Sequence, residues 1–223
     1  MQITYLYHSA FLIELEQHIL LFDYVEGNLP ALDLSKEIVV FVTHAHSDHF
    51  SRVIFDLRKH YPNVRYILSD DIKTVQESDI LFVKANEMYE VGNMNIQTLC
   101  STDCGVAFLV KVEDKTIYHA GDLNWWDWTL EDTLAESEKM KQDYVKEIMK
   151  LKDQEIDVAM VPVDDRLGES FDKGIDVFME LTNTKKVFPM HMWGKYEIIT
   201  KLENKAYQAK IVRIKKENES FQI

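Results

Sequence analysis

Residues 43–50, with the sequence THAHSDHF, constrain this chain more than any other segment. They follow residues 37–42, an apolar and largely β-branched run that is typical of a buried strand. They precede residues 51–60, which predict a helix. Three histidines and one aspartate therefore crowd a turn at the carboxyl end of a strand, which is where open α/β sheets usually carry their sites.

The side chains of this turn form a ligand set for first-row metal ions, which bind imidazole nitrogen and carboxylate oxygen. One tight turn cannot aim all of them at a single ion without strain. Two neighbouring ions are the better interpretation, with His44 and His46 on one ion and Asp48 and His49 on the other. The amino end of the following helix favours a carboxylate and an anionic ligand nearby. The alternative is a polar loop with hydrogen-bonded histidines. Three histidines and one aspartate within six residues, directly after an apolar strand, disfavour this alternative.

The H-x-H-x-D-H spacing of this turn resembles the signature of the metallo-β-lactamase superfamily. Further landmarks of that family follow in order at residues 7–14 (YHSAFLIE), 119–122 (HAGD) and 188–191 (FPMH). The resemblance spans nearly the whole chain and is closest to the small bacterial metal-dependent hydrolases, similar to ascorbate-6-phosphate lactonase and ribonuclease Z-like members. It implies an α/β (α+β) fold, a four-layer αββα sandwich, formed by one domain over residues 1–223.

The resemblance also implies two further metal ligands. His191 ends the last strand of the site and joins Asp48 and His49 on the second ion. Asp122 bridges both ions, since its two oxygens can hold cations roughly 3.5–4 Å apart. Its neighbour Gly121 is expected to let the backbone approach the ions. Asp23, in the loop after the third strand, is expected to support the metal histidines.

One ligand of the family pattern is missing. Residues 98–105 contain no histidine, so the ion held by His44 and His46 lacks its usual third imidazole. Asp103 is the best substitute in this segment, and weaker candidates are Cys100, Cys104 and His8. Mixed oxygen and nitrogen ligands suit one or two divalent ions, with zinc first and manganese or iron also compatible.

Four residues near these ligands are candidates for binding the substrate. His8 lies where relatives place a polar residue near the metals, although an ordinary turn histidine is equally compatible. Trp125 and Trp126 follow Asp122 and form either a substrate wall or a packing anchor. Arg166 can grip a phosphate or carboxylate, and a salt bridge with the preceding aspartates is the slightly favoured alternative.

Composition narrows the choice of partners. The chain has 223 residues, of which 46% are hydrophobic, a net charge of −13, and only two cysteines, which are expected to be free thiols. An acidic surface repels phosphate backbones, so a small-molecule substrate is expected and nucleic acid is not. No stretch approaches ~18 apolar residues, so no membrane span is predicted and the cytoplasm is the expected location. The sequence predicts no particular oligomeric state.

The rest of the chain predicts short strands and several helices. The following predictions matter below, because they concern segments of weaker pattern. Acidic residues predict a short helix over residues 70–76, and an apolar stripe that includes Leu130 and Leu134 predicts a long helix from 130 to 152. Residues 207–214 and 219–223 predict closing strands or a tail packed on the sheet, while residues 2–7 predict an edge or half-buried strand.

Together these features predict a metal-dependent hydrolase that attacks an ester, lactone or phosphoester of a small anionic substrate. Asp48 is the expected catalytic residue, because it would both ligate a metal and orient the attacking water. The alternative is a non-hydrolytic metal-binding or sensing protein with a degraded first site. A redox di-iron role is weaker, since no flavin domain follows.

Overall fold

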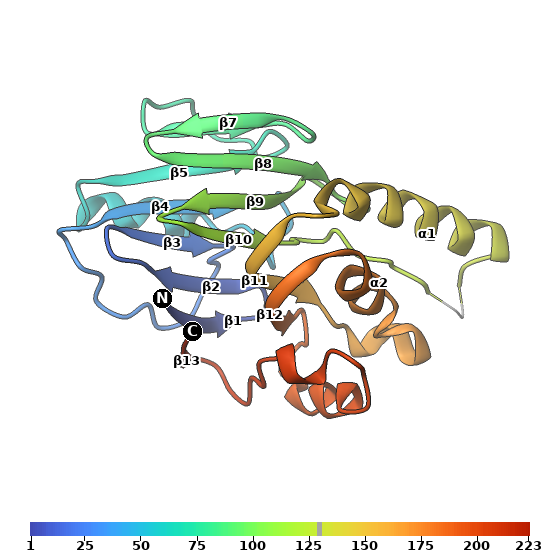
Figure 1. Cartoon of the computed structure of the whole chain (residues 1–223). Helices are drawn as coiled ribbons and strands as arrows, with labels where there is room; N and C mark the ends of the chain where they lie inside the picture. Colours follow the sequence, from blue (N-terminus) through green and yellow to red (C-terminus); the bar gives the residue numbers. More distant parts are fainter. Residues whose placement is uncertain (129–130) are drawn as a thin grey trace.

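The computed structural model describes residues 1–128 and 131–223, and these form two stacked mixed β-sheets (Figure 1). The first sheet contains, in spatial order, β13 (Glu219–Gln222), β1 (Gln2–Tyr7), β2 (Ala10–Glu14), β3 (His18–Phe22), β4 (Glu37–Val42), β5 (Val64–Ser69) and β6 (Ile80–Val83). The second contains β12 (Asn183–Met190), β11 (Glu155–Pro162), β10 (Lys115–His119), β9 (Val106–Val112), β8 (Met94–Cys100) and β7 (Met88–Val91).

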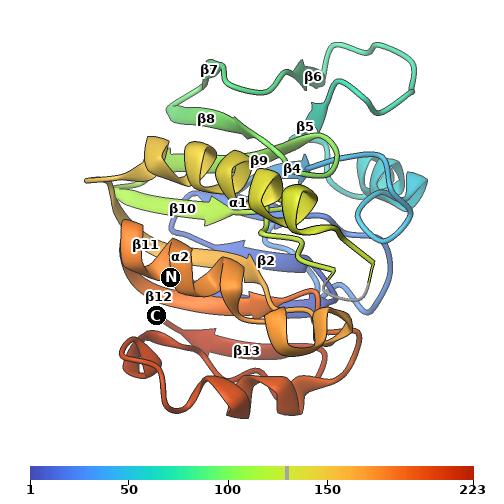
Figure 2. The ribbon, with the colours of Figure 1, turned by 90° about the vertical axis from the view of Figure 1, so that its right-hand side faces the viewer.

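Helical layers cover the outer face of each sheet and complete the predicted αββα order. The helices α1 (Leu134–Ile148) and α2 (Lys173–Leu181) cross in front of the second sheet (Figure 2). A 3₁₀ segment, η1 (Arg52–Lys59), packs on the first sheet. The other 3₁₀ segments are η2 (Met149–Leu151), η3 (Asp165–Ser170), η4 (Tyr196–Leu202) and η5 (Gln208–Lys210).

Strand β4 illustrates why the central strands are apolar without alternation. Val39 and Phe41 face the core between the two sheets. Val40 and Val42 face a second apolar cluster on the outer side of their sheet, which Ile54 of η1 helps to cover. Both faces of the strand are therefore buried, as expected for a parallel strand between two layers.

The topology brings several strand ends to one edge of the sandwich. Strands β3, β4 and β5 run parallel in one sheet, and β10, β11 and β12 run parallel in the other. Their carboxyl ends deliver the turn after β4, Asp122 after β10 and His191 after β12. Because these segments follow parallel strands, ligands that are far apart in the sequence meet at one edge.

Several local predictions need correction. Residues 70–76 form a turn and irregular chain, because the carboxylate of Asp71 accepts a hydrogen bond from Ala45 N at 3.0 Å instead of opening a helix. The long helix begins only at Leu134, which is 92% exposed and so contributes nothing to an apolar stripe, and Leu130 lies outside the described residues. Residues 207–214 contain η5 and one bridging residue, Ile211, so this segment is the predicted tail packed on the sheet and not a closing strand.

The chain ends differ in how well they were predicted. Strand β13 confirms the closing strand predicted near residue 219, and it pairs with β1. Strand β1 is therefore an interior strand, so its prediction as an edge or half-buried strand was wrong. Within the described residues, no helix is long and apolar enough to cross a membrane.

Candidate metal centre

The turn after β4 is fixed by tight packing around Thr43. Asp23 accepts hydrogen bonds from Thr43 N at 2.8 Å and from Thr43 Oγ1 at 2.7 Å, and Val106 N donates to Thr43 O at 2.9 Å. A Cβ atom on Gly105 would lie 2.1 Å from Thr43 O, and one on Gly121 would lie 2.7 Å from Thr43 Cβ. Both glycines also have positive φ. The prediction for Gly121 therefore needs correction, because its close approach is to Thr43.

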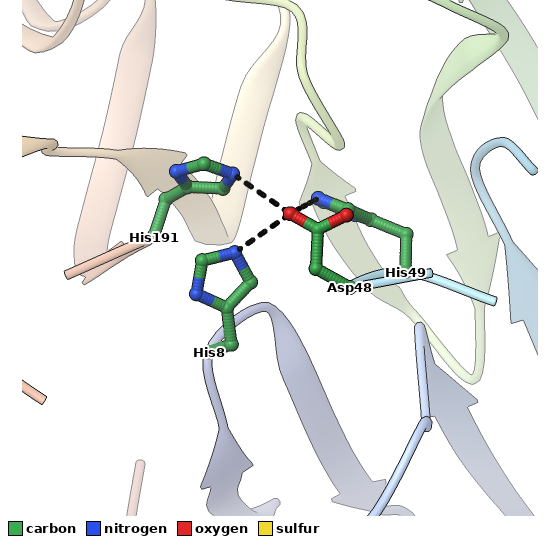
Figure 3. A group of neighbouring side chains, drawn as sticks. All are labelled: His8, Asp48, His49 and His191. Carbon is green, nitrogen blue, oxygen red and sulfur yellow. Dashed lines mark ion pairs between the residues drawn. The ribbon is translucent and has the colours of Figure 1, made fainter. Parts of the chain in front are cut away.

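A buried donor group contains His8, Asp48, His49 and His191. One ligand atom from each residue lies within 4.8 Å of all the others. Asp48 Oδ2 is 3.5 Å from His8 Nε2, 3.8 Å from His191 Nε2 and 3.9 Å from His49 Nε2 (Figure 3). All three imidazoles are at most 2% exposed. This spacing lets the four side chains surround one cation.

A second, exposed donor group contains His44, His46, Asp103 and Asp122. His44 Nε2 lies 3.1 Å from His46 Nδ1, and His46 Nδ1 lies 3.6 Å from Asp103 Oδ2. The side chains of His46 and Asp103 are 50% and 45% exposed. We call these two sets the buried group and the exposed group.

Asp122 lies between the two groups. Its Oδ1 is 3.2 Å from His49 Nε2 and 3.4 Å from His191 Nε2, while its Oδ2 is 3.5 Å from His44 Nε2. Each carboxylate oxygen thus faces a different donor group. This is the geometry that the sequence predicted for a bridging aspartate.

Asp103, the residue that the sequence offered in place of the missing histidine, lies beside His46. Asp103 contributes its carboxylate beside His46, which places it in the exposed group. The weaker candidates do not lie there: His8 belongs to the buried group, and the free thiols of Cys100 and Cys104 belong to neither group of the described residues.

Carboxylates hold the outer nitrogens of two buried histidines. His49 Nδ1 donates to Asp23 Oδ2 at 2.7 Å, which places Asp23 where the sequence predicted. His191 Nδ1 donates to Asp164 Oδ2, also at 2.7 Å. Such contacts fix the tautomer and leave Nε2 free to bind a metal. The role of Asp164 was missed, although its position directly after a predicted strand was an available signal.

Unpaired polar atoms indicate that a cation fits the buried group. His8 Nδ1 and Nε2, His49 Nε2, His191 Nε2 and Asp122 Oδ1 are buried and have no hydrogen-bond partner among the described residues. Leaving a buried polar group unpaired costs roughly 1–3 kcal/mol. The Nε2 atoms of His8, His49 and His191 all lie within 3.9 Å of Asp48 Oδ2, so a divalent ion beside that oxygen would satisfy these three nitrogens together.

The electrostatic environment agrees with this fit. Burial works to lower the pKa of His49, but the carboxylates of Asp122 and Asp23 outweigh it and raise that pKa to about 10. Burial opposes ionisation of Asp122, yet His49 and His191 hold its pKa well below the usual range. Burial lowers the pKa of His8 to about 4, so this imidazole is neutral near pH 7 and its lone pair is available. The centre therefore attracts positive charge and offers neutral nitrogen to bind it.

Both groups face a pocket of about 300 Å³, which we call the inner pocket. Its lining residues are His46, Asp48, Thr102, Asp103, Asp122, Trp126, Trp128, Met140, Arg166 and His191. Trp126 is held there by the hydrogen bond from its Nε1 to Asp122 O at 2.8 Å. Trp125 does not line the pocket, and the ammonium groups of Lys141 and Lys173 each lie 5.3 Å from its ring centroid. Trp128 was not among the predicted substrate-binding residues.

Arg166 forms the salt bridge that the sequence slightly favoured, and it also lines the inner pocket. Its Nε lies 2.9 Å from both carboxylate oxygens of Asp164, and its Nη2 lies 2.5 Å from Asp164 Oδ2. Asp165 instead pairs with Lys195 and Lys201. The Arg166 side chain is 46% exposed and still lines the inner pocket, so the salt bridge orients the guanidinium toward the site.

Comparison with known proteins gives the same family as the geometry. The sequence model of the β-lactamase superfamily domain matches residues 2–133, more than half of the chain. A UPF0173 metal-dependent hydrolase from Nanoarchaeum equitans is 28% identical over 230 residues, covering 94% of this chain and 95% of that protein.

Two solved structures share the fold. Igni18, a metallo hydrolase from Ignicoccus hospitalis, has a TM-score of 0.66 at 18% identity, covering 100% of this chain and 98% of that one. CmlA, a diiron β-hydroxylase from Streptomyces venezuelae, has a TM-score of 0.54 at 12% identity, covering 86% of this chain and 44% of that one. By the family match, the chain belongs to the β-lactamase superfamily and is a relative of its metal-dependent hydrolases.

Proposed function

We propose that this protein is a metal-dependent hydrolase that cleaves an ester, lactone or phosphoester bond of a small anionic substrate. The observation that carries the proposal is the pair of donor groups that share Asp122 and face one pocket. The name of the Nanoarchaeum relative supports the reaction class. The narrower likeness to lactonase and ribonuclease Z-like proteins remains a prediction.

Each of the two ions would have its own set of ligands. His44, His46 and Asp103 would hold the first ion and His8, Asp48, His49 and His191 the second, with Asp122 shared. Divalent ions in such sites lower the pKa of water and polarise an oxygen of the substrate. Zinc is the first choice on this donor set, and manganese or iron are compatible with it.

The protein's own groups would orient the reactants. Burial opposes ionisation of Asp48, but His8 and His49 hold its pKa well below the usual range, so its carboxylate stays charged near pH 7. Because it lines the inner pocket, Asp48 can accept a hydrogen bond from the attacking water and hold it in place. Arg166 would pair with an anionic group and stabilise negative charge that develops during attack.

Turnover by metal-loaded protein tests the proposal. We expect zinc-loaded protein to hydrolyse at least one class in a panel of generic esters, lactones and phosphodiesters, and chelation to abolish this activity. Asp122→Asn should lose turnover, whereas Asp56→Asn, an exposed aspartate paired with Lys59, should keep it. Inorganic phosphate should compete with the substrate. Equal activity with and without bound metal would contradict the proposal.

A second candidate function is non-hydrolytic metal binding or sensing. The observation that favours it is the exposure of His46 and Asp103, which leaves the first ion open to solvent and to exchange. A protein that binds one ion tightly but turns over no compound in the panel would support this alternative.

A further inference from the structure

A second hollow lies beside the inner pocket. It has a volume of about 530 Å³ and we call it the outer pocket. Its lining residues are Tyr7, Val25, Glu26, Ser47, Asp48, Phe50, Ser51, Arg166 and Trp193. Among the residues that the structure describes, only Asp48 and Arg166 line both pockets. These two side chains therefore form the ridge between the pockets, directly beside the buried donor group.

Arg166 is held at this ridge by aromatic rings from both sides. Its guanidinium carbon lies 4.9 Å from the ring centroid of Trp193, which lines the outer pocket. It lies 5.7 Å from the ring centroid of Trp128, which lines the inner pocket. Asp164 binds the Nε and Nη2 groups, and among the described residues Nη1 has no hydrogen-bond acceptor. One edge of a fixed guanidinium thus remains available to a ligand.

The inner pocket is too small for a whole substrate of ordinary size. Ligand pockets typically measure ≈ 300–1,000 Å³, so about 300 Å³ is the lower end of the range. The ions and the attacking water must share this space. A substrate must therefore continue beyond the inner pocket, and the outer pocket is the adjoining hollow across the ridge.

We propose that the substrate is a two-part anion, with its hydrolysable group in the inner pocket, a carboxylate or phosphate at Arg166, and an apolar limb in the outer pocket. This rests on the proposed function, whose substrate class it narrows. The limb is apolar because Tyr7, Phe50 and Trp193 offer aromatic surface to it. Glu26 on the same lining disfavours a second negative charge there.

Binding of inert probes tests this proposal without turnover. The probes are 4-phenylbutanoate, which has an anion and an apolar limb, acetate, which lacks the limb, and 4-phenylbutanamide, which lacks the charge. Dissociation constants are measured by calorimetry on zinc-loaded protein. We expect 4-phenylbutanoate to bind about tenfold tighter than either of the other two. The test measures binding and not turnover, so it gives a result even if the protein hydrolyses no compound in the earlier panel.

Two matched pairs of variants locate the contacts. Arg166→Gln should remove most of the preference for the acid over the amide, while Arg166→Lys should keep part of it. Phe50→Ala should weaken 4-phenylbutanoate about threefold to tenfold without changing acetate. Phe55→Ala is the control, because Phe55 packs against Phe50 but does not line the outer pocket. An unchanged acid preference in Arg166→Gln, or equal effects of Phe50→Ala and Phe55→Ala, would overturn the proposal.

Discussion

The buried and exposed donor groups are built differently, although they share Asp122. In the buried group, three imidazoles are at most 2% exposed, and carboxylates of Asp23 and Asp164 orient two of them. In the exposed group, His46 and Asp103 are about half exposed. The comparison teaches that packing organises the buried group before a metal binds, whereas the metal itself must partly order the exposed group.

The difference follows from where each group lies in the fold. The buried group takes its ligands from three separate places, the turn between β1 and β2, the turn after β4 and the end of β12. His8 also accepts a hydrogen bond from His191 N at 3.2 Å, so two of these places are joined through the backbone. The side chains of His46 and Asp103 are about half exposed, so we expect the buried group to bind its ion more tightly.

Removal of His191 should have the largest effect. His191→Ala takes away one of the buried nitrogens and its support from Asp164, so the tight ion should be lost. Elemental analysis after gel filtration measures this loss. His60→Ala, which removes an exposed histidine outside both groups, is the control and should keep its metal. Retention of the tight ion in His191→Ala would refute the assignment of the buried group.

Removal of the His8 imidazole should have the next largest effect. His8→Ala leaves three ligands of the buried group and Asp122 in place, so the ion should remain but bind roughly a hundredfold more weakly, the upper end of the cost of changes around metal ligands. Chelator competition gives the dissociation constant. If the dissociation constant of the metal is unchanged, His8 is not a metal ligand, and its predicted role as a substrate-binding residue is favoured instead.

The support from Asp164 should contribute less than a direct ligand. Asp164→Asn keeps the shape of the side chain but weakens its hold on His191, so we expect about a tenfold loss of affinity for the tight ion. Asp165→Asn is a close control, because Asp165 is the next residue and its carboxylate pairs with the exposed lysines Lys195 and Lys201. If both variants lose the same affinity, the loss is a general charge effect.

The exposed group should show the smallest change in binding energy, because its ion is already the weaker one. Asp103→Ala should leave about one ion per chain at metal concentrations that saturate the buried group. Asp56→Ala, an exposed aspartate on η1, should leave both. Two ions that persist in Asp103→Ala would show that another residue completes the exposed group.

Local sequence patterns predicted the parts of this centre that depend on neighbouring residues. The apolar run of β4 and the following turn placed His44 to His49 correctly, since a strand and its end are local features. Asp103 was proposed as a ligand because it lies in the short segment that lacks the usual histidine, and the structure brings it beside His46. The bridging position of Asp122 came from the family resemblance.

Contacts between distant segments could not be predicted in the same way. His8 adopts a positive φ of 47°, and only the packing of its turn against the end of β12 shows which ion it faces. Asp164 precedes Arg166 by two residues, so the sequence favoured a local salt bridge, and the position of Asp164 after a strand did not identify His191 as its partner. Trp125 and Trp126 are adjacent, and only tertiary packing decides which of them lines the pocket.

A zinc titration of the metal-free protein, followed by chelator competition, tests the central claim most directly. If one buried and one exposed group share Asp122, two ions should bind in separate steps, and the first should bind at least tenfold more tightly than the second. Two steps of equal affinity, or saturation at a single ion per chain, would contradict the account.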